Sequence, residues 1–512
     1  MTVVAHEPSG LEGVVISVDV DIRRGIPSID LVGLADGAIR EARERVRAAV
    51  RNSGFQFPLD HILVSLSPAG LRKEGSAYDL PIALAVLGAA GILPDPGEPL
   101  LAIGELRLDG EVRPVHAVLP AIAAGLGAGI RRFLVPVENR SEASALRQGT
   151  IYPIARLSEA VEILSAIRDG TLPSSCCESE NEVITNDSYE GDFSDIKGLT
   201  RVRRALEIGA AGGHHMLLFG PPGSGKTLAA RRFATILPDL TPLESIEATT
   251  IHSLAGMPLP RGGLIRRPPF RSPHHSASLE GLVGGGKTLR PGEISLSHRG
   301  VLFLDEVPEF HRDALQALRE PIEEGRVSLA RAGKLSRFPA DFTLLAAANP
   351  CPCGNLGRRD RVCVCSPPEI GRYWRKIGGP LLDRIDIRIP VRPEDARTLR
   401  GPLGESSETV RGRVMSALLK QRKRYSGYGF VSNAKLPAAL VEKYCSLDDR
   451  ASACFPHAIA SLGLSSRACH SILKTARTIA DLEGMDDIGE NELLEAIQHR
   501  RYADSDYFWN DL

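Results

Sequence analysis

The sequence predicts an α/β fold built on an open sheet, and three stretches of the chain support this prediction. Gly220 to Thr227 reads GPPGSGKT and lies between an apolar run typical of a buried strand and a run of helix-forming residues. Val301 to Glu306 reads VLFLDE, four apolar residues followed by two carboxylates. A third apolar run, Phe342 to Ala348, ends at Asn349. Polar groups at the carboxyl ends of such strands meet at one edge of the sheet, where ligands bind.

The first stretch is a complete phosphate-binding loop of the form GxxxxGKT. Its glycines let the backbone fold tightly, so that N–H groups can point at phosphate oxygens. Lys226 would reach the β- and γ-phosphates, and the Thr227 hydroxyl would ligate Mg²⁺. The alternative is a glycine-rich turn that matches by chance. The predicted nucleotide-binding residues are Gly220, Pro221, Pro222, Gly223, Ser224, Gly225, Lys226, Thr227 and Asp305.

The other two stretches supply the groups that hydrolysis needs. Asp305 would hold the Mg²⁺ through water, and Glu306 would polarise the attacking water. The amide of Asn349 would orient that water or sense the γ-phosphate. An ordinary buried strand with acidic end residues is the alternative for VLFLDE. Together the three stretches predict hydrolysis of a nucleoside triphosphate, most simply ATP with Mg²⁺.

The whole chain sets broad limits on function. Its 512 residues suggest roughly two to four domains. A net charge of −1 gives no overall basic signal, so contact with nucleic acid would come from local patches. No apolar run of about 18 residues and no leader-like start is present, so we expect a cytoplasmic protein without a membrane partner. Four of the nine cysteines cluster, which indicates a reducing compartment and a metal site rather than disulfides.

Predicted elements alternate through the first block, 1–168, and become helical in the last, 393–512. In the first block we expect strands at 14–22, 62–66, 101–108 and 133–137, and helices at 38–52 and 80–90. The last block has candidate helices at 410–424, 437–444, 466–482 and 489–501. Ser, Glu, Asn and Asp dominate 169–195, which indicates an exposed linker, and Cys176 and Cys177 within it are interpreted as incidental.

With these motifs in order, the chain resembles the ComM/YifB type of magnesium-chelatase-like AAA+ proteins over nearly its full length. The resemblance rests on RPPFRSPHHSASLEGLVGGG (267–286), RPGEISLSHRGVLFLDE (290–306), NPCPCG (349–354), GPLLDRIDI (379–387) and IDLVGLADGAIREARERVRAA (29–49). It implies a Lon-protease-like (S5-type) α+β domain at 1–168, a flexible linker at 169–195, a AAA+ P-loop α/β domain at 196–392 and a C-terminal helical lid at 393–512.

The resemblance also implies a function. Members of this family would form hexameric rings, bind single-stranded and branched DNA with weak sequence preference, and drive branch migration as helicase-like ATPases, notably during natural transformation. A magnesium-chelatase-like ATPase that remodels a protein partner is the alternative, and a protein remodeller or latent protease is a third. The basic tip of a predicted hairpin, described below, favours an anionic polymer over a peptide.

Two arginines are assigned by the resemblance. Arg384, in LLDRID, matches the arginine finger of this class and would reach the γ-phosphate of a neighbouring subunit. Arg467, in SSRA, matches the lid arginine called sensor 2. A surface or salt-bridged arginine is the alternative for each. With Glu306 and Asn349 they complete the predicted catalytic set.

The first block departs from a working Lon protease. The stretch KEGSAYDLPIALA (73–85) resembles the loop that carries the nucleophile of that family, but Ala77 falls where the serine belongs. Ser76 is one position away, and a slip of one residue would turn its side chain from the required geometry. We therefore expect a non-proteolytic scaffold or DNA-contacting domain, with a Ser76/Lys73 dyad as the alternative.

A cysteine cluster follows Asn349. Cys351, Cys353, Cys363 and Cys365 form two CxC pairs separated by nine residues. Four thiolates suit a closed tetrahedral zinc site with a structural role, since protein would fill all four positions. Reduced, metal-free thiols are the alternative.

Two basic segments are candidate DNA contacts. The segment 261–299 lies where the family carries its helix-2 insert, and a flexible basic loop there could track a phosphate backbone. The segment 327–337 reads as a hairpin that turns at Ala332-Gly333. Solvated charged loops are the alternative for both. The predicted DNA contacts are Arg331 and Lys334 in the hairpin and Arg266, Arg267, Arg271 and Lys287 in the insert.

Overall fold

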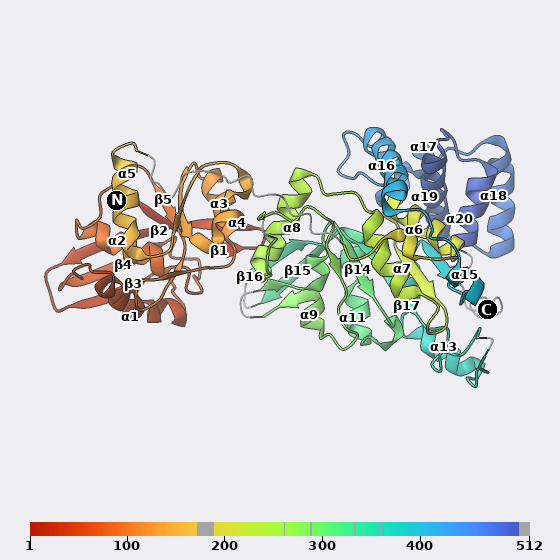
Figure 1. The fold of residues 1–512 in the computed structure, drawn as a ribbon, viewed down its shortest axis with the longest axis horizontal. Helices are drawn as coiled ribbons and strands as arrows, with labels where there is room; N and C mark the ends of the chain where they lie inside the picture. Colours follow the sequence, from red (N-terminus) through yellow and green to blue (C-terminus); the bar gives the residue numbers. More distant parts are fainter. Residues whose placement is uncertain (172–188, 261, 287–288, 332–333, 359, 501–512) are drawn as a thin grey trace.

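The computed structural model describes residues 1–171, 189–260, 262–286, 289–331, 334–358 and 360–500. Its elements form three parts that follow one another along the long axis of the molecule (Figure 1). A mixed α/β domain lies at one end, a parallel sheet that carries the phosphate-binding loop lies in the middle, and a group of helices lies at the other end. Cys176, Cys177 and most of the predicted linker lie outside the described residues.

The amino-terminal domain is built on a seven-stranded mixed sheet of order β3-β4-β2-β1-β5-β8-β9. Its strands are β1 (Val3–Ser9), β2 (Glu12–Arg23), β3 (Ser28–Val32), β4 (His61–Ser67), β5 (Leu100–Ala102), β8 (Arg132–Pro136) and β9 (Thr150–Ile154), with a small hairpin β6 (Glu105–Leu106) and β7 (Val112–Arg113). Its helices are α1 (Gly37–Asn52), α2 (Asp79–Ala89), α3 (Val118–Gly127), α4 (Arg140–Ala143) and α5 (Ala160–Arg168). The mixed α/β character agrees with the prediction, and the likeness to the Lon protease stays a prediction.

The predicted helix at 38–52 shows why the sequence pattern succeeds here. Asp36 caps α1, because its carboxylate accepts a hydrogen bond from the backbone of Ile39. Every apolar side chain that recurs at helical spacing is buried: Ile39, Ala42, Val46, Ala49 and Val50. Between them Arg40, Glu41, Arg43 and Glu44 are exposed, whereas Arg45 is partly buried and donates a 2.8 Å hydrogen bond to the buried Asp79.

The central domain contains a five-stranded parallel sheet of order β11-β14-β17-β10-β18. Its strands are β10 (Met216–Phe219), β11 (Phe270–Arg271), β14 (Val301–Leu304), β17 (Thr343–Ala348) and β18 (Ile387–Pro390). Its helices are α6 (Thr200–Gly212), α7 (Lys226–Phe233), α8 (Pro242–Ala255), α9 (Leu279–Val283), α10 (Glu293–Leu296), α11 (Arg312–Ala317), α12 (Arg319–Glu324), α13 (Pro367–Arg375) and α14 (Gly379–Leu382). All three strands predicted around the site are confirmed.

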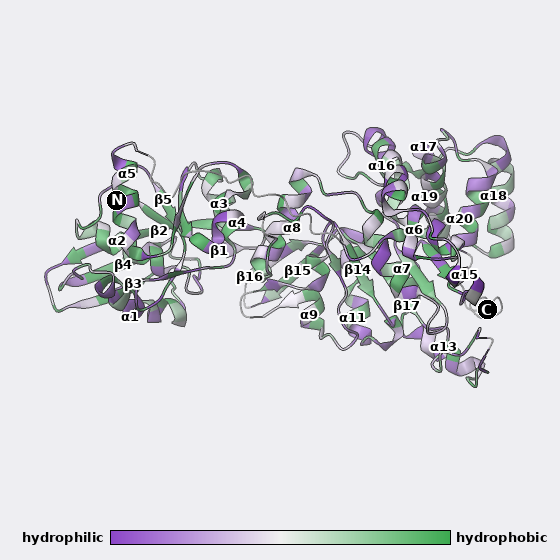
Figure 2. Cartoon of the chain, viewed as in Figure 1, coloured by the Kyte–Doolittle hydropathy of each residue, from purple (hydrophilic) through white to green (hydrophobic). Residues whose placement is uncertain are grey.

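Both faces of this sheet are covered, which explains the unbroken apolar runs of its strands. Successive residues of β10 alternate: Met216 and Leu218 join a core shared with α6, α7 and the carboxyl-terminal helices. Leu217 and Phe219 join a second core with α11 and α13. Hydrophobic residues accordingly concentrate on the strands, with hydrophilic ones on the outer helix surfaces (Figure 2).

The described residues of the segment 261–299 form more regular structure than the predicted flexible loop. Its Phe270–Arg271 strand pairs with β14 as the edge of the core sheet, because the backbone there continues the parallel ladder. Between α9 and α10 the described residues form a short antiparallel hairpin of β12 (Gly284–Gly285) and β13 (Arg290–Pro291). Residues 261 and 287–288 lie outside the description.

The hairpin predicted at 327–337, the second hairpin of this domain, is confirmed. Strand β15 (Arg326–Arg331) pairs antiparallel with β16 (Lys334–Pro339), and Arg331 lies opposite Lys334 at the last pair before the turn. The turn residues, 332–333, are not among those described. The two hairpins lie side by side, since a methyl group placed on Gly284 would come within 3.2 Å of Cδ1 of Leu329.

The carboxyl-terminal part is helical, as predicted. Its helices are α15 (Ala396–Arg400), α16 (Ser407–Arg424), α17 (Ala438–Tyr444), α18 (Asp449–Leu462), α19 (Ser466–Glu483) and α20 (Glu490–Arg500). The prediction missed α18, which contains Pro456 in its interior. No helix among the described residues is long and apolar enough to cross a membrane.

Contacts join the three parts. The Ser253 hydroxyl of α8 donates a 2.5 Å hydrogen bond to Glu142 of the amino-terminal domain. The turn between β1 and β2 lies against the second hairpin, because a methyl group on Gly10 would lie 3.4 Å from the backbone oxygen of Arg337. Phe193, inside the predicted linker, is buried in the central core, so ordered packing begins before residue 196.

Candidate active site

The phosphate-binding loop connects β10 to α7, and its lysine points into the loop. The Lys226 ammonium donates hydrogen bonds to the carbonyl oxygens of Gly220 (2.7 Å) and Pro221 (3.0 Å) and to Oδ1 of Asn349 (3.3 Å). Gly223 and Gly225 have φ values of 79° and 92°, which side chains rarely adopt. The sequence prediction that these residues and Asn349 share one site is thus supported by direct contacts.

The carboxylates at the end of β14 lie across from the loop. The Thr227 hydroxyl donates a 2.8 Å hydrogen bond to Oδ2 of Asp305, so the two predicted magnesium contacts are adjacent. Glu306 adopts a left-handed backbone conformation, φ 51°, which turns its carboxylate out of the strand. Nδ1 of His275 lies 3.9 Å from Oε2 of Glu306. Sequence reasoning grouped His275 with the basic insert and missed this neighbour.

The loop has the chemistry that a nucleoside triphosphate and Mg²⁺ require. Burial lowers the pKa of the Lys226 ammonium to about 8, although the charges of Asp305 and Glu306 raise it. The Ser224 hydroxyl is buried in the loop without a hydrogen-bond partner among the described residues. A buried cation and an unsatisfied hydroxyl beside a helix N-terminus fit an anionic phosphate. Thr227 and Asp305 would hold Mg²⁺, which would neutralise phosphate charge.

The cysteine loop packs directly on the phosphate-binding loop. A methyl group placed on Gly354 would lie 3.0 Å from Cγ of Pro222. The indole N–H of Trp374 donates a 3.1 Å hydrogen bond to the carbonyl of Pro350, and its ring meets Phe219 edge-on at 6.0 Å. The loop that follows Asn349 is therefore held between α13 and the nucleotide site.

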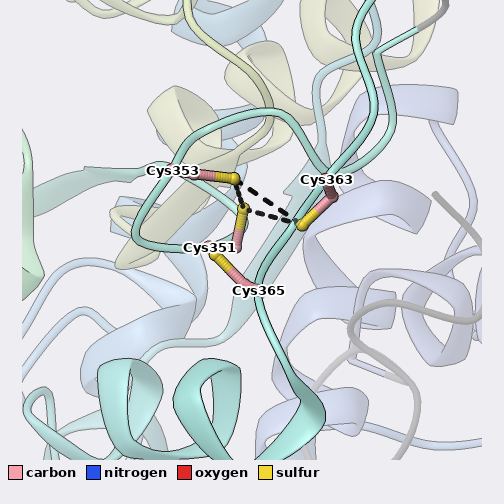
Figure 3. A group of neighbouring side chains, drawn as sticks. All are labelled: Cys351, Cys353, Cys363 and Cys365. Carbon is pink, nitrogen blue, oxygen red and sulfur yellow. Dashed lines mark hydrogen bonds between the residues drawn. The ribbon is translucent and has the colours of Figure 1, made fainter.

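The four thiols of that loop converge (Figure 3). Sγ of Cys351 lies 3.4 Å from that of Cys353 and 3.6 Å from that of Cys363, and all four sulfurs lie within 4.8 Å of one another. A tetrahedron of sulfurs bound to zinc at about 2.3 Å has edges of about 3.8 Å. The donor set and its spacing therefore fit a structural zinc ion.

The thiols of the loop differ in acidity. A hydrogen bond from the backbone of Asn355 lowers the pKa of the Cys353 thiol to about 6, and burial raises that of Cys351 to about 12. Cys353 is therefore the more acidic thiol of the two, and a thiolate is the form that binds a metal cation. The cysteines of the described residues are free.

Arg384 and Arg467 lie at the opposite edge of the sheet from the phosphate-binding loop. Arg384 precedes β18, and the next carboxylate, Asp386, receives a hydrogen bond from Ser471 of α19. The phosphate-binding loop follows the other end of β10, which pairs with β18 in parallel. Four residues of strand, roughly 13 Å, separate the two edges. Arg467 shares the carboxylate of Glu323 with Arg384, so it also belongs to this distant edge.

The predicted DNA contacts differ in their surroundings. Arg271 donates two hydrogen bonds to Glu293, at 2.7 and 2.6 Å, so its charge is already paired. The Arg267 guanidinium lies over the ring of Tyr189, at 5.4 Å. Arg266 and Arg331 are exposed. Lys287 lies outside the described residues, as does the side chain of Lys334.

In the loop that holds Lys73 and Ser76, the two side chains of the alternative dyad have other partners. The Lys73 ammonium is fully buried and donates 2.9 Å hydrogen bonds to the carbonyls of Gly33 and Leu66, with a third to Pro68. The Ser76 hydroxyl donates to Glu105 instead. Among the described residues no hydrogen bond joins Ser76 to Lys73, so the lysine is a structural anchor.

Comparisons with known families match all three parts of the chain. Residues 192–399 match the family described as "Magnesium chelatase, subunit ChlI". Residues 18–139 match "Subunit ChlI of Mg-chelatase", and residues 404–500 match "Magnesium chelatase, subunit ChlI C-terminal".

Full-length relatives extend these matches. The competence protein ComM of Haemophilus influenzae is 40% identical, over 96% of this chain and 95% of its own length. The uncharacterized protein YifB of Escherichia coli is also 40% identical, over the same shares of the two chains. The magnesium-chelatase 38 kDa subunit of Cereibacter sphaeroides is 25% identical, over 61% of this chain and 92% of its own length.

Proposed function

Because the chain belongs to the ComM/YifB-type family of magnesium-chelatase-like AAA+ ATPases, we propose that it is a ring-forming motor that moves DNA. The ring is a hexamer. Hydrolysis of ATP with Mg²⁺ drives branch migration of recombination intermediates in the cytoplasm, as in natural transformation.

The oligomeric part of this proposal rests on one observation: the predicted catalytic residues of a single chain lie at two opposite edges of the sheet, so the site is divided. Lys226, Thr227, Asp305 and Glu306 gather at one edge of the sheet, and Arg384 lies at the other. Charge stabilisation of phosphoryl transfer requires a cation at the γ-phosphate. Arg384 would supply that cation to the next subunit, and Arg467 would act beside it, so each working site needs two chains.

The paired hairpins support DNA as the substrate of the motor. Arg331 and Lys334 are register partners at the last pair of β15–β16, next to β12–β13. Cations on a hairpin end suit a phosphate backbone and give weak sequence preference. Arg266 and Lys287 are further proposed contacts, and Arg271 is left out because Glu293 neutralises it.

Zinc would have a structural role in this motor. Bound to Cys351, Cys353, Cys363 and Cys365, it would stabilise the loop that follows Asn349 and hold that loop against the phosphate-binding loop. The amino-terminal domain would act as a scaffold without protease activity, since Lys73 and Ser76 have other partners.

The second candidate is a remodelling ATPase that acts on a protein partner. The similarity to a magnesium-chelatase 38 kDa subunit favours it, at lower identity than the similarity to ComM.

One experiment separates the two. ATPase activity of the full-length chain is measured alone and with single-stranded, duplex and forked DNA. Branch migration is measured as the separation of a labelled four-way junction into duplexes. We expect forked and single-stranded DNA to raise the ATPase rate and the junction to be separated only with ATP. An ATPase that ignores every DNA substrate, and no junction processing, would exclude the DNA motor and favour the protein remodeller.

A further inference from the structure

Glu323, in the last turn of α12, joins the two arginines that the neighbouring site needs. Its Oε1 accepts a hydrogen bond from Nη2 of Arg384 and another, 3.1 Å long, from Nη2 of Arg467. The arginines come from different elements, the loop before β18 and the start of α19. A single carboxylate oxygen therefore holds two guanidinium groups together.

Arg384 is retracted in this arrangement. Its side chain is 8% exposed, and its Nη1 donates a 2.5 Å hydrogen bond to the carbonyl of Pro380 in its own helical turn. Its Nε is buried without a hydrogen-bond partner among the described residues. Burial and the nearby charge of Arg467 both lower the pKa of the Arg384 guanidinium. The retracted position thus disfavours the charge of Arg384, and the carboxylate of Glu323 offsets this only in part.

Glu323 is ionised here, and its carboxylate lies where an anionic ligand of the two arginines would bind. Burial opposes its ionisation, but the charges of Arg384 and Arg467 outweigh burial and hold the pKa of Glu323 below its ordinary value. A γ-phosphate is also an anion. Two anions close to one pair of cations repel each other, so the phosphate and Glu323 compete for the same guanidinium groups.

We propose that Glu323 is an internal substitute for the γ-phosphate of the neighbouring subunit. It holds Arg384 and Arg467 retracted in a free chain and releases them when a nucleotide-loaded neighbour docks. Glu323 is a positioning residue, because it acts through the two arginines. The inference rests on the proposed trans role of Arg384 and adds a residue that suppresses that role until the ring forms.

The test is the ATPase of the full-length chain, with protein and ATP concentrations varied separately. In E323Q the shape is kept and the competing charge is removed. We expect the protein concentration at half-maximal activity and the KM for ATP to fall about two- to fivefold, with kcat unchanged. The effect should be modest because Glu323 and Arg467 are each about half exposed. E323S removes the carboxylate by another route and should shift both quantities in the same direction.

E324Q is the matched control. Glu324 is the next residue, and its ion pair is with Arg326, 2.8 Å away on the base of the hairpin. It should leave both concentrations at their wild-type values. A higher KM or a lower kcat in E323Q would overturn the proposal, since Glu323 would then support catalysis. Values equal to those of E324Q would also overturn it.

R384A separates this proposal from the one on which it rests. If R384A keeps wild-type turnover, the trans role of Arg384 fails and the substitute role fails with it. If R384A is inactive while E323Q and E323S behave like E324Q, only the role of Glu323 is lost.

Discussion

At the residue scale, Lys226 and Glu306 occupy one site but do different things. Lys226 is inside the loop, bound to carbonyls and to Asn349, where its charge would meet a phosphate. Glu306 stands at the rim of the site on a left-handed backbone turn, 51% exposed, with His275 near it. Binding and cleavage should therefore be separable by substitution.

Glu306→Gln should bind ATP and fail to cleave it. The amide keeps the shape but cannot polarise water, so turnover should fall on the order of 100-fold or more. Lys226→Ala should weaken nucleotide binding itself, by roughly 10-fold or more, because it removes a charged hydrogen-bond donor. Fluorescent-nucleotide titration and steady-state ATPase measurements distinguish the two. Glu309→Gln, on the same turn and paired with Lys376, is the control. Wild-type turnover in Glu306→Gln would remove the assignment.

Asp386 anchors the carboxyl-terminal helices to the sheet through Ser471 of α19, and its effect should depend on pH. Burial would raise its pKa, but hydrogen bonds from His214 and Ser471 outweigh burial and hold the pKa well below its usual range. The folded pKa is lower than the unfolded value of about 4, so this stability is present above about pH 4 and lost as the pH falls below it.

Asp386→Asn should therefore destabilise the chain by about 1–3 kcal/mol at pH 7. The difference from wild type should shrink below about pH 4. Chemical denaturation at several pH values measures it. A difference that stays constant down to pH 3 would show that the charge of Asp386 does not matter.

At the scale of elements, the cysteine loop should couple metal to nucleotide. We expect one zinc ion per chain by elemental analysis of protein purified without added metal. Cys363→Ser should lose the zinc and weaken nucleotide binding, because the loop that packs on Pro222 would lose its anchor. Cys454→Ser, on α18, removes a thiol outside the cluster and should change neither quantity. Zinc-free wild-type protein with four titratable thiols would favour a metal-free loop.

The hairpin β15–β16 should matter for DNA and not for basal hydrolysis. Replacing Arg331 and Lys334 by Ala should leave assembly and basal ATPase intact and reduce DNA stimulation. Each lost phosphate contact should flatten the log–log salt dependence of DNA binding by about one unit. Arg326→Ala, at the base of the same hairpin and paired with Glu324, is the control for lost charge. An unchanged salt slope in the double variant would move the DNA contact elsewhere.

Sequence periodicity predicted elements well where local rules agree with packing. The strands before Gly220, Asp305 and Asn349 and the helix at 38–52 are examples. It failed at α18, because Pro456 lacks the N–H of a helix interior and signals a break that the surrounding packing overrides. The edge strand Phe270–Arg271 was missed because two residues show no period. The motif residues of the site could be predicted from the sequence. Glu323 could not, because it contacts Arg384 and Arg467 and the three residues lie on segments far apart in the chain.

At the scale of the whole molecule, the division of the site predicts complementation. Arg384→Ala and Glu306→Gln chains should each be inactive alone. Mixed rings contain some interfaces with an intact Glu306 on one side and an intact Arg384 on the other, so the mixture should recover part of the ATPase activity. Measurement follows incubation under conditions of subunit exchange, with labelled subunits to confirm it. A mixture as inactive as its parents, despite exchange, would contradict the trans role.

The proposed trans role of Arg384, at the far edge of the sheet, would also decide when ATP is hydrolysed. A chain outside a ring would bind ATP without hydrolysing it, however much of the protein is made. A closed ring would hydrolyse ATP at every subunit interface, and a ring open at one interface would lose one of its active sites. The rate of ATP hydrolysis would then report how completely the ring has closed around its DNA substrate.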